Sequence, residues 1–599
     1  MRVGADTGGT FTDLVTEDGR VAKVLSTPTD PSQAVAAGLE ALSGDDRRPG
    51  VLAHGTTVAT NALLERRGAR VALVTNAGFT DVIEIARQDR PSLYDIWADR
   101  PEPLVPRDLR LEVRGRLDAT GRELEPVDPS SLGRLPEGVE VVAVCLLHAD
   151  LNPAHEQAVG AAVRASTGLD VVCSHEVSPE FREYERTVTT VINAYLRPRC
   201  RGYLRSVAGL AGDVLVMTSA GGLVPAAAGA DLPVALLLSG PAGGVIAGAA
   251  AAAAAGWADA VTFDMGGTST DVCLAQGGVP EAAPGRVAAG FPVRLPALDI
   301  HTIGAGGGSI ARIDPGGALV VGPASAGADP GPACYGRGGW EPTVTDADLV
   351  LGRIPADAAF PGLGRLNREA ASKALAGAGV TAEGVVTVVD ANMERAVRRV
   401  SVERGVDPSS LALVAFGGAG PLHACAVAEA LGMPAVVVPP RAGVLSAVGL
   451  LCGPRQRDLV RSWPTPDDHD GLGRALAELA EEARRAVGSG GEPAITTSVD
   501  CRYRGQSHEL TVATVAGFEP EHRRRNGYAR PGAPVEVVAL RARARVAAGV
   551  DPADLPPPDG PPRRPLRGPA VLVEPDCTVW VPEGWSADVG PDGSWVITQ

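Results

Sequence analysis

An internal repeat of eight residues, D-x-G-G-T-x-T-D, constrains this chain more than any other feature. The first copy is DTGGTFTD at residues 6–13, and the second is DMGGTSTD at residues 264–271. Both copies are flanked by short segments that read as strands, at residues 2–5, 12–16 and 20–25 and again at 261–263 and 272–275. A repeated unit of this kind indicates a duplicated fold. We therefore expect two related halves, each with the motif at the tip of a β-hairpin.

The chemistry of the motif points to a phosphate ligand. Paired glycines let backbone N–H groups approach phosphate oxygens, threonine hydroxyls add donors, and a leading aspartate can hold Mg²⁺ through water. Because each turn joins two strands, it differs from the Walker A loop and the dinucleotide fingerprint, which lead from a strand into a helix. We predict that the two copies form a clamp. The predicted binding residues are Asp6, Gly8, Gly9, Thr10 and Thr12 in the first copy and Asp264, Gly266, Gly267 and Thr268 in the second.

A third glycine-rich turn follows the second copy. A strand expected at residues 411–415 leads into F-G-G-A-G, and Pro421 then opens a helix that ends near Gly432. In an actin-like fold, a Gly-Gly-x-Gly turn before a helix packs against the adenosine. The order phosphate, phosphate, adenosine therefore predicts ATP in a cleft between the two halves. The expected adenosine residues are Gly417, Gly418 and Gly420.

Longer stretches resemble the hydantoinase A/oxoprolinase family, in the order in which that family has them. They include HGTTVATNALLERRGARVALVTNAGF, LSGPAGGVIAGA, LDIHTIGAGGGSIARID and AFGGAGPLHACAVAEALG, within residues 1–451. Near the C-terminus, RYRGQSHEL and GPAVLVEPDCTVWVPEGW resemble the β-rich tail of the family. Two departures stand out. Residues 533–567 look shorter than the usual tail, and Thr218 and Ala220 stand where relatives often carry glutamine and asparagine.

The resemblance implies a fold, an activity and a partner. The expected fold class is α/β, with duplicated actin-like ATPase domains of the sugar-kinase and heat-shock-chaperone type and a β-rich C-terminal domain. We divide the chain into a first half at 1–185, a second half at 186–451, and a helix, linker and β-rich domain at 452–599. The implied activity is ATP-dependent opening of a cyclic amide such as a hydantoin or 5-oxoproline, with ATP-dependent carboxylation of a ketone as the alternative. ATP and Mg²⁺ are the implied cofactors, and a hydantoinase B-like subunit is the implied partner in a hetero-oligomer.

Candidate substrate residues lie between the nucleotide motifs. Thr56 and Thr57 offer hydroxyl donors to a transferring phosphoryl group, although capping of the helix that starts near Val58 explains them as well. Asp299 and His301 alternate along one expected strand, which suits a second divalent metal or a substrate, although a core histidine is an equal reading of His301. The predicted catalytic residues are Thr56, Thr57, Asp264 and His301, and the predicted metal ligands are Asp6, Asp264, Asp299 and His301.

Charge and cysteine usage exclude several classes of partner and location. With 55 Lys and Arg against 71 Asp and Glu, the formal net charge of −16 argues against a nucleic-acid partner. The nine cysteines include no C-x-x-C pair, so neither structural zinc nor a disulfide framework is indicated, and a reducing cytoplasm is expected. Residues 232–258 carry no charge, but their glycines and alanines favour a buried strand, a turn and a packed helix over a membrane span.

The chemistry of an amide explains why ATP would be needed, because an amide carbonyl is a poor electrophile. We expect this chain to pass the γ-phosphoryl group to an amide or enolate oxygen, with Asp6 and Asp264 holding Mg²⁺. The reaction would then finish on the partner subunit. Two other classes stay open, a kinase of a small polyol and a nucleotide-switched binding module like the heat-shock chaperones. Neither accounts for the long agreement of motifs.

Overall fold

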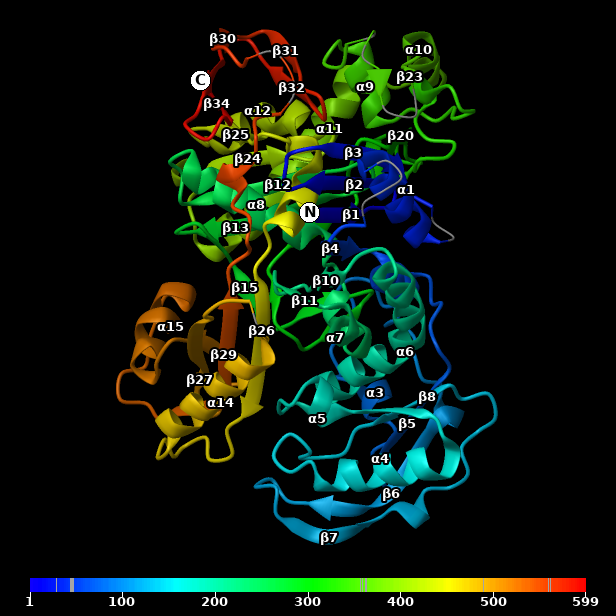
Figure 1. Cartoon of the computed structure of the whole chain (residues 1–599), viewed down its shortest axis with the longest axis vertical. Coiled ribbons are helices and arrows are strands. Elements are labelled where there is room, and N and C mark those ends of the chain that lie inside the picture. Colours follow the sequence, from blue (N-terminus) through cyan, green and yellow to red (C-terminus); the bar gives the residue numbers. More distant parts are fainter. Residues whose placement is uncertain are drawn as a thin grey trace.

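The computed structural model describes residues 1–27, 30–43, 48–355, 357, 359–360, 364–488, 490–558, 560 and 562–599. Two large sheets and one smaller sheet organise these residues (Figure 1). In order across the first large sheet, the strands are β28 (Leu510–Val512), β27 (Ala494–Tyr503), β29 (Val535–Val546), β26 (Arg455–Ser462), β11 (Leu223–Pro225), β10 (Asp213–Met217), β4 (Val51–Thr56), β1 (Arg2–Thr7), β2 (Phe11–Thr16) and β3 (Val21–Leu25). In the second they are β14 (Val279–Pro280), β13 (Thr270–Gln276), β12 (Ala260–Met265), β24 (Ala412–Phe416), β25 (Val436–Val438), β34 (Trp595–Thr598), β33 (Ser586–Val589) and β30 (Leu566–Arg567).

The two large sheets share one topology. The order β3-β2-β1-β4-β10 in the first matches β14-β13-β12-β24-β25 in the second. In each, the strand that leads into the repeat pairs antiparallel with the strand after it and parallel with a later strand. The duplicated actin-like architecture predicted from the repeat is confirmed. Because β10 pairs with β4, the first sheet reaches beyond residue 185, and the three-part division of the chain stays a proposal.

A smaller α/β unit is inserted into the first half. Its sheet has the order β7 (Glu123–Asp128), β6 (Arg110–Leu117), β5 (Val71–Asn76), β8 (Val141–Val144) and β9 (Asp170–Cys173). Every residue of β5 and β8 is buried, as expected for parallel strands covered on both faces. The long helix α6 (Glu183–Ala208) returns the chain to the first half (Figure 1). The sequence pattern did not separate this insert from the half that carries it.

Two helices cross at the seam between the halves, α8 (Gly240–Ala254) and α13 (Leu445–Leu451). They meet through glycine: a Cβ at Gly449 would lie 1.9 Å from the backbone oxygen of Gly243. The helix α13 also lies on β1, where a Cβ at Gly4 would be 2.2 Å from the Ala447 oxygen. Backbones approach this closely only where side chains are missing. The seam therefore depends on small residues, which the high glycine content of the chain supplies.

The uncharged segment at residues 232–258 contains a 3₁₀ turn and an α-helix and no strand. The 3₁₀ turn η4 (Pro233–Leu236) stands where a strand was expected, so that part of the prediction is wrong, whereas the packed helix is confirmed as α8. Pro233 has no N–H to donate to a strand ladder, and Ala235 instead donates to the Leu232 oxygen at 3.0 Å. In the part of the chain that the structure describes, no single helix is long and apolar enough to cross a membrane. The helices Arg368–Gly377 and Ala382–Arg404 reach that length and apolarity only when taken together, and they meet at a bend of 82°.

The C-terminal part contributes to both large sheets instead of forming one separate β-rich domain. Strands β26 to β29 extend the first sheet, and α14 (Leu472–Ala486) covers them, which confirms the amphipathic helix expected there. Strands β30, β33 and β34 then return to the second sheet, where β34 pairs with β25. The pairing of β26 with both β11 and β29 joins the first part of the tail to the first sheet, whereas β34 joins its last part to the second sheet. The linker expected within residues 452–599 corresponds to the run Gly488-Ser489-Gly490-Gly491, of which Ser489 lies outside the described residues.

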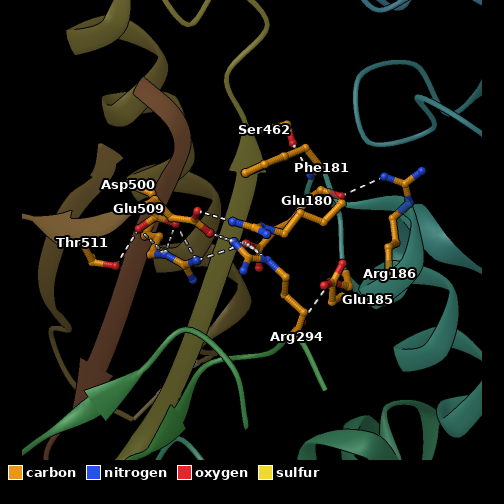
Figure 2. A network of polar contacts seen from close by, with 12 residues as sticks. Glu180, Phe181, Glu185, Arg186, Arg294, Ser462, Asp500, Glu509 and Thr511 are labelled. Atoms are coloured by element: carbon orange, nitrogen blue, oxygen red, sulfur yellow. Dashed lines mark hydrogen bonds and ion pairs between the residues drawn. The ribbon is translucent and has the colours of Figure 1, made fainter. Parts of the chain in front are cut away.

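A buried ion network fastens the first part of this tail to the first half (Figure 2). Glu180, just before α6, accepts from Arg294 at 3.0 Å and from Arg541 of β29 at 3.1 Å. Arg294 also binds Glu509 at 2.6 Å, and Arg541 binds Asp500 at 2.7 Å. The side chains of Glu180 and Asp500 are at most 1% exposed. A charge buried this deeply is tolerated only because it is paired.

Removing Glu180 should leave two arginines with one carboxylate each in place of two. We expect Glu180→Ala to cost about 3–5 kcal/mol and to loosen the unit around β27 to β29, because Arg294 and Arg541 would lose a shared carboxylate in a buried place. Calorimetry and limited proteolysis would measure this. Glu403→Ala is the control, since Glu403 and its partner Arg399 are more than half exposed and their pair is worth less than about 1 kcal/mol. Equal melting temperatures for the two variants would contradict the role given to Glu180.

Candidate functional site

The two repeat hairpins have the same internal geometry. In the first, Asp6 lies opposite Asp13, and the Gly8 N–H donates to the Phe11 oxygen at 3.0 Å. In the second, Asp264 lies opposite Asp271, and Gly266 donates to the oxygen of Ser269 at 3.0 Å. Each leading aspartate thus lies two residues before the first glycine of the turn, with the last aspartate of the motif across the ladder. The hairpin tips expected from the sequence are present in both halves.

The hairpin tips also face each other across the seam. A Cβ at Gly267 would lie 3.7 Å from the Thr10 hydroxyl, so the two loops approach within contact distance. The charge of Asp6 is close enough to raise the pKa of Asp264. The geometry of a two-sided clamp, which the repeat predicted, is therefore what the structure shows.

A glycine on the neighbouring parallel strand makes room for each leading aspartate. A Cβ at Gly55 of β4 would lie 2.7 Å from Asp6 Oδ1. A Cβ at Gly417, just after β24, would lie 2.3 Å from Asp264 Oδ1, and Gly417 also has a φ of +79°. A side chain at either position would displace the carboxylate. Both halves therefore place a buried aspartate next to a glycine that leaves room for its carboxylate.

The electrostatics of the two acids are unusual. Burial, followed by the charge of Asp13, raises the pKa of Asp6 to about 7. Burial, followed by the charges of Asp271 and Asp6, raises the pKa of Asp264 to about 8. Lys23 opposes this only in the first hairpin, where it binds Asp13 at 2.7 Å. A cation between the hairpins would favour the charged form of both acids.

The third glycine-rich turn lies against the second hairpin. The N–H of Ala419 donates to the oxygen of Met265 at 3.0 Å, and α12 (Gly420–Leu431) starts at once. A Cβ at Gly418 would meet no atom within 4 Å, so this glycine borders open space. The loop at residues 304–308 closes the other side, since Gly307 and Gly308 donate to the Gly266 and Gly267 oxygens at 3.0 and 2.6 Å. The three predicted nucleotide segments thus meet at one place.

The predicted residues of H-G-T-T have different surroundings. His54 is buried, with Nδ1 at 3.0 Å from the Ala5 oxygen and Nε2 at 2.6 Å from the Tyr203 hydroxyl, and burial lowers its pKa to about 4. Thr56 is buried and accepts from the Val58 N–H at 3.2 Å, so it helps to start α2 (Val58–Leu64). Thr57 is the N-cap residue but makes no side-chain cap bond. Its hydroxyl instead donates to the Thr7 oxygen at 3.5 Å and accepts from the Asn61 amide at 3.4 Å, so a ligand would have to replace one of these long bonds.

Two other predicted residues are engaged elsewhere. Thr12 is fully buried and its hydroxyl lies 3.0 Å from the Ser26 hydroxyl, so it already has a partner within the first half. Asp299 binds Arg404 at 2.5 Å and precedes the strand β19 (His301–Ile303) that carries His301. The expected alternation along one strand is therefore absent, and the second metal at Asp299 and His301 stays a proposal.

Among the described residues, the group with metal-ligand spacing is a different one, Glu156, Cys173 and His175. Glu156 already accepts four hydrogen bonds, from the N–H groups of Leu146 and His175, the Ser174 hydroxyl and the His175 ring. These bonds use the lone pairs that a metal would need. The cluster joins α4 (Ala154–Thr167) to the start of α5 (Ser174–Val177) in the inserted unit, and we give it a structural role.

The buried acids predict a pH-dependent stability of the ligand-free chain. The pKa of Asp264 is higher in the folded chain than in the unfolded chain, so the folded state binds this proton more tightly. The free energy of unfolding therefore falls as pH rises from about 4 through 8. Asp264→Asn removes this loss. We expect the variant to melt roughly 2 °C above the wild type at pH 8, with the difference shrinking towards pH 5. Differential scanning calorimetry without nucleotide or Mg²⁺ tests this, and a variant that melts below the wild type at pH 8 would contradict it.

Known proteins match this chain over most of its length. The hydantoinase/oxoprolinase family matches residues 186–457, and the N-terminal region of that family matches residues 2–167. Caprolactamase subunit alpha from Pseudomonas jessenii is 34% identical over 100% of this chain and 99% of its own length. The crystal structure of the ATP-dependent caprolactamase from Pseudomonas jessenii superposes over the whole of both chains, with a TM-score of 0.87 and 32% identity.

Two further relatives are named for different activities. The acetophenone carboxylase gamma subunit from Aromatoleum aromaticum is 33% identical over 84% of this chain and 76% of its own length. The 5-oxoprolinase 1 of Arabidopsis thaliana is 34% identical over 86% of this chain, which spans only 46% of that longer protein. The family resemblance that the motifs indicated is confirmed: the chain belongs to the hydantoinase/oxoprolinase family.

Proposed function

We propose that this chain is the ATP-handling subunit of an enzyme that hydrolyses a cyclic amide, namely a hydantoin, 5-oxoproline or a related lactam. The observation that carries the proposal is the pair of facing D-x-G-G-T-x-T-D hairpins with a buried acid in each. The caprolactamase and 5-oxoprolinase relatives support the substrate class. Carboxylation of a ketone is the second candidate, which the acetophenone carboxylase gamma subunit favours.

The residues of the clamp fit Mg²⁺-ATP. Asp6 Oδ1 and Thr7 Oγ1 are buried oxygens that lack a hydrogen-bond partner, and Mg²⁺ prefers such oxygen ligands. A Cβ at Gly9 would meet no atom within 4 Å, which leaves space beside the backbone for a phosphate group. We assign Mg²⁺ to Asp6 and Asp264, the phosphates to Gly8, Gly9, Thr10, Gly266, Gly267 and Thr268, and the adenosine to Gly417, Gly418 and Gly420.

The chain's own residues would prepare the amide for attack. When bound, Mg²⁺-ATP supplies a phosphoryl group that turns the amide oxygen into a leaving group. Thr57, with Thr56 behind it, orients the accepting oxygen from the start of α2. Backbone N–H groups of the two glycine turns, other than those of Gly8 and Gly266 that bond within their hairpins, donate to the negative charge that develops. His54 stays neutral because burial lowers its pKa, so it fixes the strand without adding charge.

A hydantoinase B-like subunit is our proposed partner for completing the hydrolysis. Two relatives are named as subunits, alpha and gamma, and 5-oxoprolinase 1 has more than half of its length outside the match. Cys334 offers no nucleophile here, because it is buried and burial raises the pKa of its thiol far above the usual range. We place the finished enzyme in the cytoplasm as a hetero-oligomer. The β-rich tail after Gly491 is one candidate for part of the contact with that partner.

A loop of the inserted unit offers a stronger contact surface. Leu93, Tyr94, Ile96 and Trp97 are 77%, 97%, 80% and 85% exposed. The loop borders a hollow of about 610 Å³ between α3 (Val82–Ile85) and α6. The two aromatic rings alone could bury about 300–500 Å², around half of the roughly 800 Å² that each partner of a stable complex supplies. We assign this apolar loop to the partner subunit.

The first test concerns ATP turnover. Asp6→Ala should abolish Mg²⁺-dependent ATP turnover and the thermal stabilisation by Mg²⁺-ATP, with the circular dichroism spectrum unchanged, because the buried ligand of the cation is lost. Asp18→Ala is the matched control, since Asp18 lies in the next turn of the same sheet and its side chain is 55% exposed. A folded Asp6→Ala chain with full ATP turnover would refute the clamp.

The second test concerns the partner. The purified chain should open a hydantoin or lactam slowly, and the complex with its hydantoinase B-like subunit should open it with ADP formed in step. Ring opening at full rate by the single chain would refute the need for a partner.

The third test concerns the apolar loop. Within the complex, Tyr94→Ser with Trp97→Ser should weaken assembly about 10- to 100-fold by analytical ultracentrifugation. Trp340→Ser, 77% exposed elsewhere, is the control; equal effects would remove the assignment of the loop.

A further inference from the structure

A second pocket lies beside the clamp. Its volume is about 190 Å³, room for about six water molecules. Three segments line it: Leu238 and Pro241 around the start of α8, residues 283–287 at and before the strand β16 (Arg286–Ala288), and residues 298–302. A pocket of this size suits one small ring with few substituents and excludes a nucleotide.

The walls of this pocket connect directly to the clamp and to the predicted substrate residues. Thr302, a lining residue, donates to Asp271 Oδ1 of the second motif at 2.5 Å. The N–H of Leu238 donates to Thr60 Oγ1 of α2 at 2.9 Å. Between Leu238 and Pro241, the Ser239 hydroxyl donates to the Thr56 oxygen at 3.4 Å. A ring in this pocket would therefore lie close to both sides of the phosphoryl-transfer site.

Arg286 is the one lining residue with an unmet electrostatic need among those described. Its Nη2 donates to the Ser219 hydroxyl, and its Nε is buried without a hydrogen-bond partner. No carboxylate of the described residues forms an ion pair with it, whereas the buried Arg186, Arg294 and Arg541 all have one. Burial alone lowers the pKa of Arg286 to about 9. A buried guanidinium without an anion is costly, and the cost is removed when an anion binds.

The only acid that lines the same pocket in the described structure cannot meet this need. Asp299 is bound to Arg404 at 2.5 Å, and Arg404 also binds Glu281 at 2.8 Å. The charges of that group are therefore satisfied among themselves. The pocket therefore keeps one positive charge without an ion pair, that of Arg286.

We propose that Arg286 binds a carboxylate carried by the ring substrate, so that this chain acts on a small carboxylated lactam or hydantoin. The inference rests on the proposed function and narrows its substrate class. A guanidinium holds a carboxylate through two parallel hydrogen bonds, which fixes the orientation of a small ring as well as its position. The carboxylate end lies at Arg286, and the amide oxygen points to the clamp. An unsubstituted lactam of the same ring size would leave the guanidinium without its partner.

A matched pair of rings tests this. 5-Oxoproline and 2-pyrrolidinone share a five-membered lactam and differ in one carboxylate. We expect 5-oxoproline to raise the melting temperature of the full chain more than 2-pyrrolidinone does, and we expect Arg286→Gln to remove that excess and Arg286→Lys to keep part of it. In the complex, Arg286→Gln should raise the KM for 5-oxoproline about 10- to 100-fold, with kcat and the KM for ATP nearly unchanged. Arg312→Gln, on the exposed side of β20 (Ser309–Ile313), is the control.

Each other outcome has a defined meaning. Equal thermal shifts for the two rings in the wild type, or equal shifts by 5-oxoproline in wild type and Arg286→Gln, would overturn the proposal. A raised KM for ATP in Arg286→Gln would do so too, because the arginine would then serve the phosphate. Because Arg286 has no ion pair, its substitution strands no acid, and the ligand-free variant should melt at or above the wild-type temperature. The thermal shifts need no turnover, so they are read separately from any failure of ATP-coupled ring opening.

Discussion

Two buried carboxylates on opposing hairpins set the terms on which the halves of this protein meet. Asp6 and Asp264 are held in a low-dielectric seam, where burial first, and then the charge of Asp13 beside Asp6 and of Asp271 beside Asp264, raises the pKa of each. The surrounding structure holds them there, since Gly55 and Gly417 clear the space and the helices α8 and α13 lock the seam through glycine contacts. The fold thus maintains an unfavourable arrangement that a bound cation would relieve. Sites of this kind are where function and stability pull in opposite directions.

Arg286 extends the same logic to the neighbouring pocket. It is a buried charge whose partner is missing from the described protein, whereas Arg294 and Arg541 in the tail network are buried charges with partners. The first arrangement leaves a need that a ligand can meet, and the second holds two parts of the chain together. The difference lies in the surroundings, because the residue type is the same. Charge balance around a buried group therefore separates a binding role from a structural one.

The repeat made the central part of the fold predictable from sequence. Eight residues that include paired glycines specify a tight hairpin locally, so the strands, the turns and their facing pairs followed from the motif alone. The inserted unit was not separated, although the buried runs of β5 and β8 were a usable signal. The alternation of Asp299 and His301 along one strand is wrong, because Asp299 lies in the break between β18 (Ala297–Leu298) and β19. The binding role proposed for Arg286 is not predictable from the sequence. It depends on a contact with Ser219, 67 positions away, and on the lack of an ion-pair partner among the described residues.

The position of β34 has a consequence for the order in which the protein forms. This strand lies beside β25, in the sheet that carries the second hairpin and the adenosine turn, yet the whole tail of strands β26 to β33 comes between them in the chain. Closing so long a loop is slow, because its entropy cost comes before the contacts that offset it. During synthesis, the edge of β25 stays uncovered until the tail has emerged, and an uncovered edge invites pairing with other chains. The second half would then reach its final form after the first, so early interruption of the tail endangers solubility before it endangers chemistry.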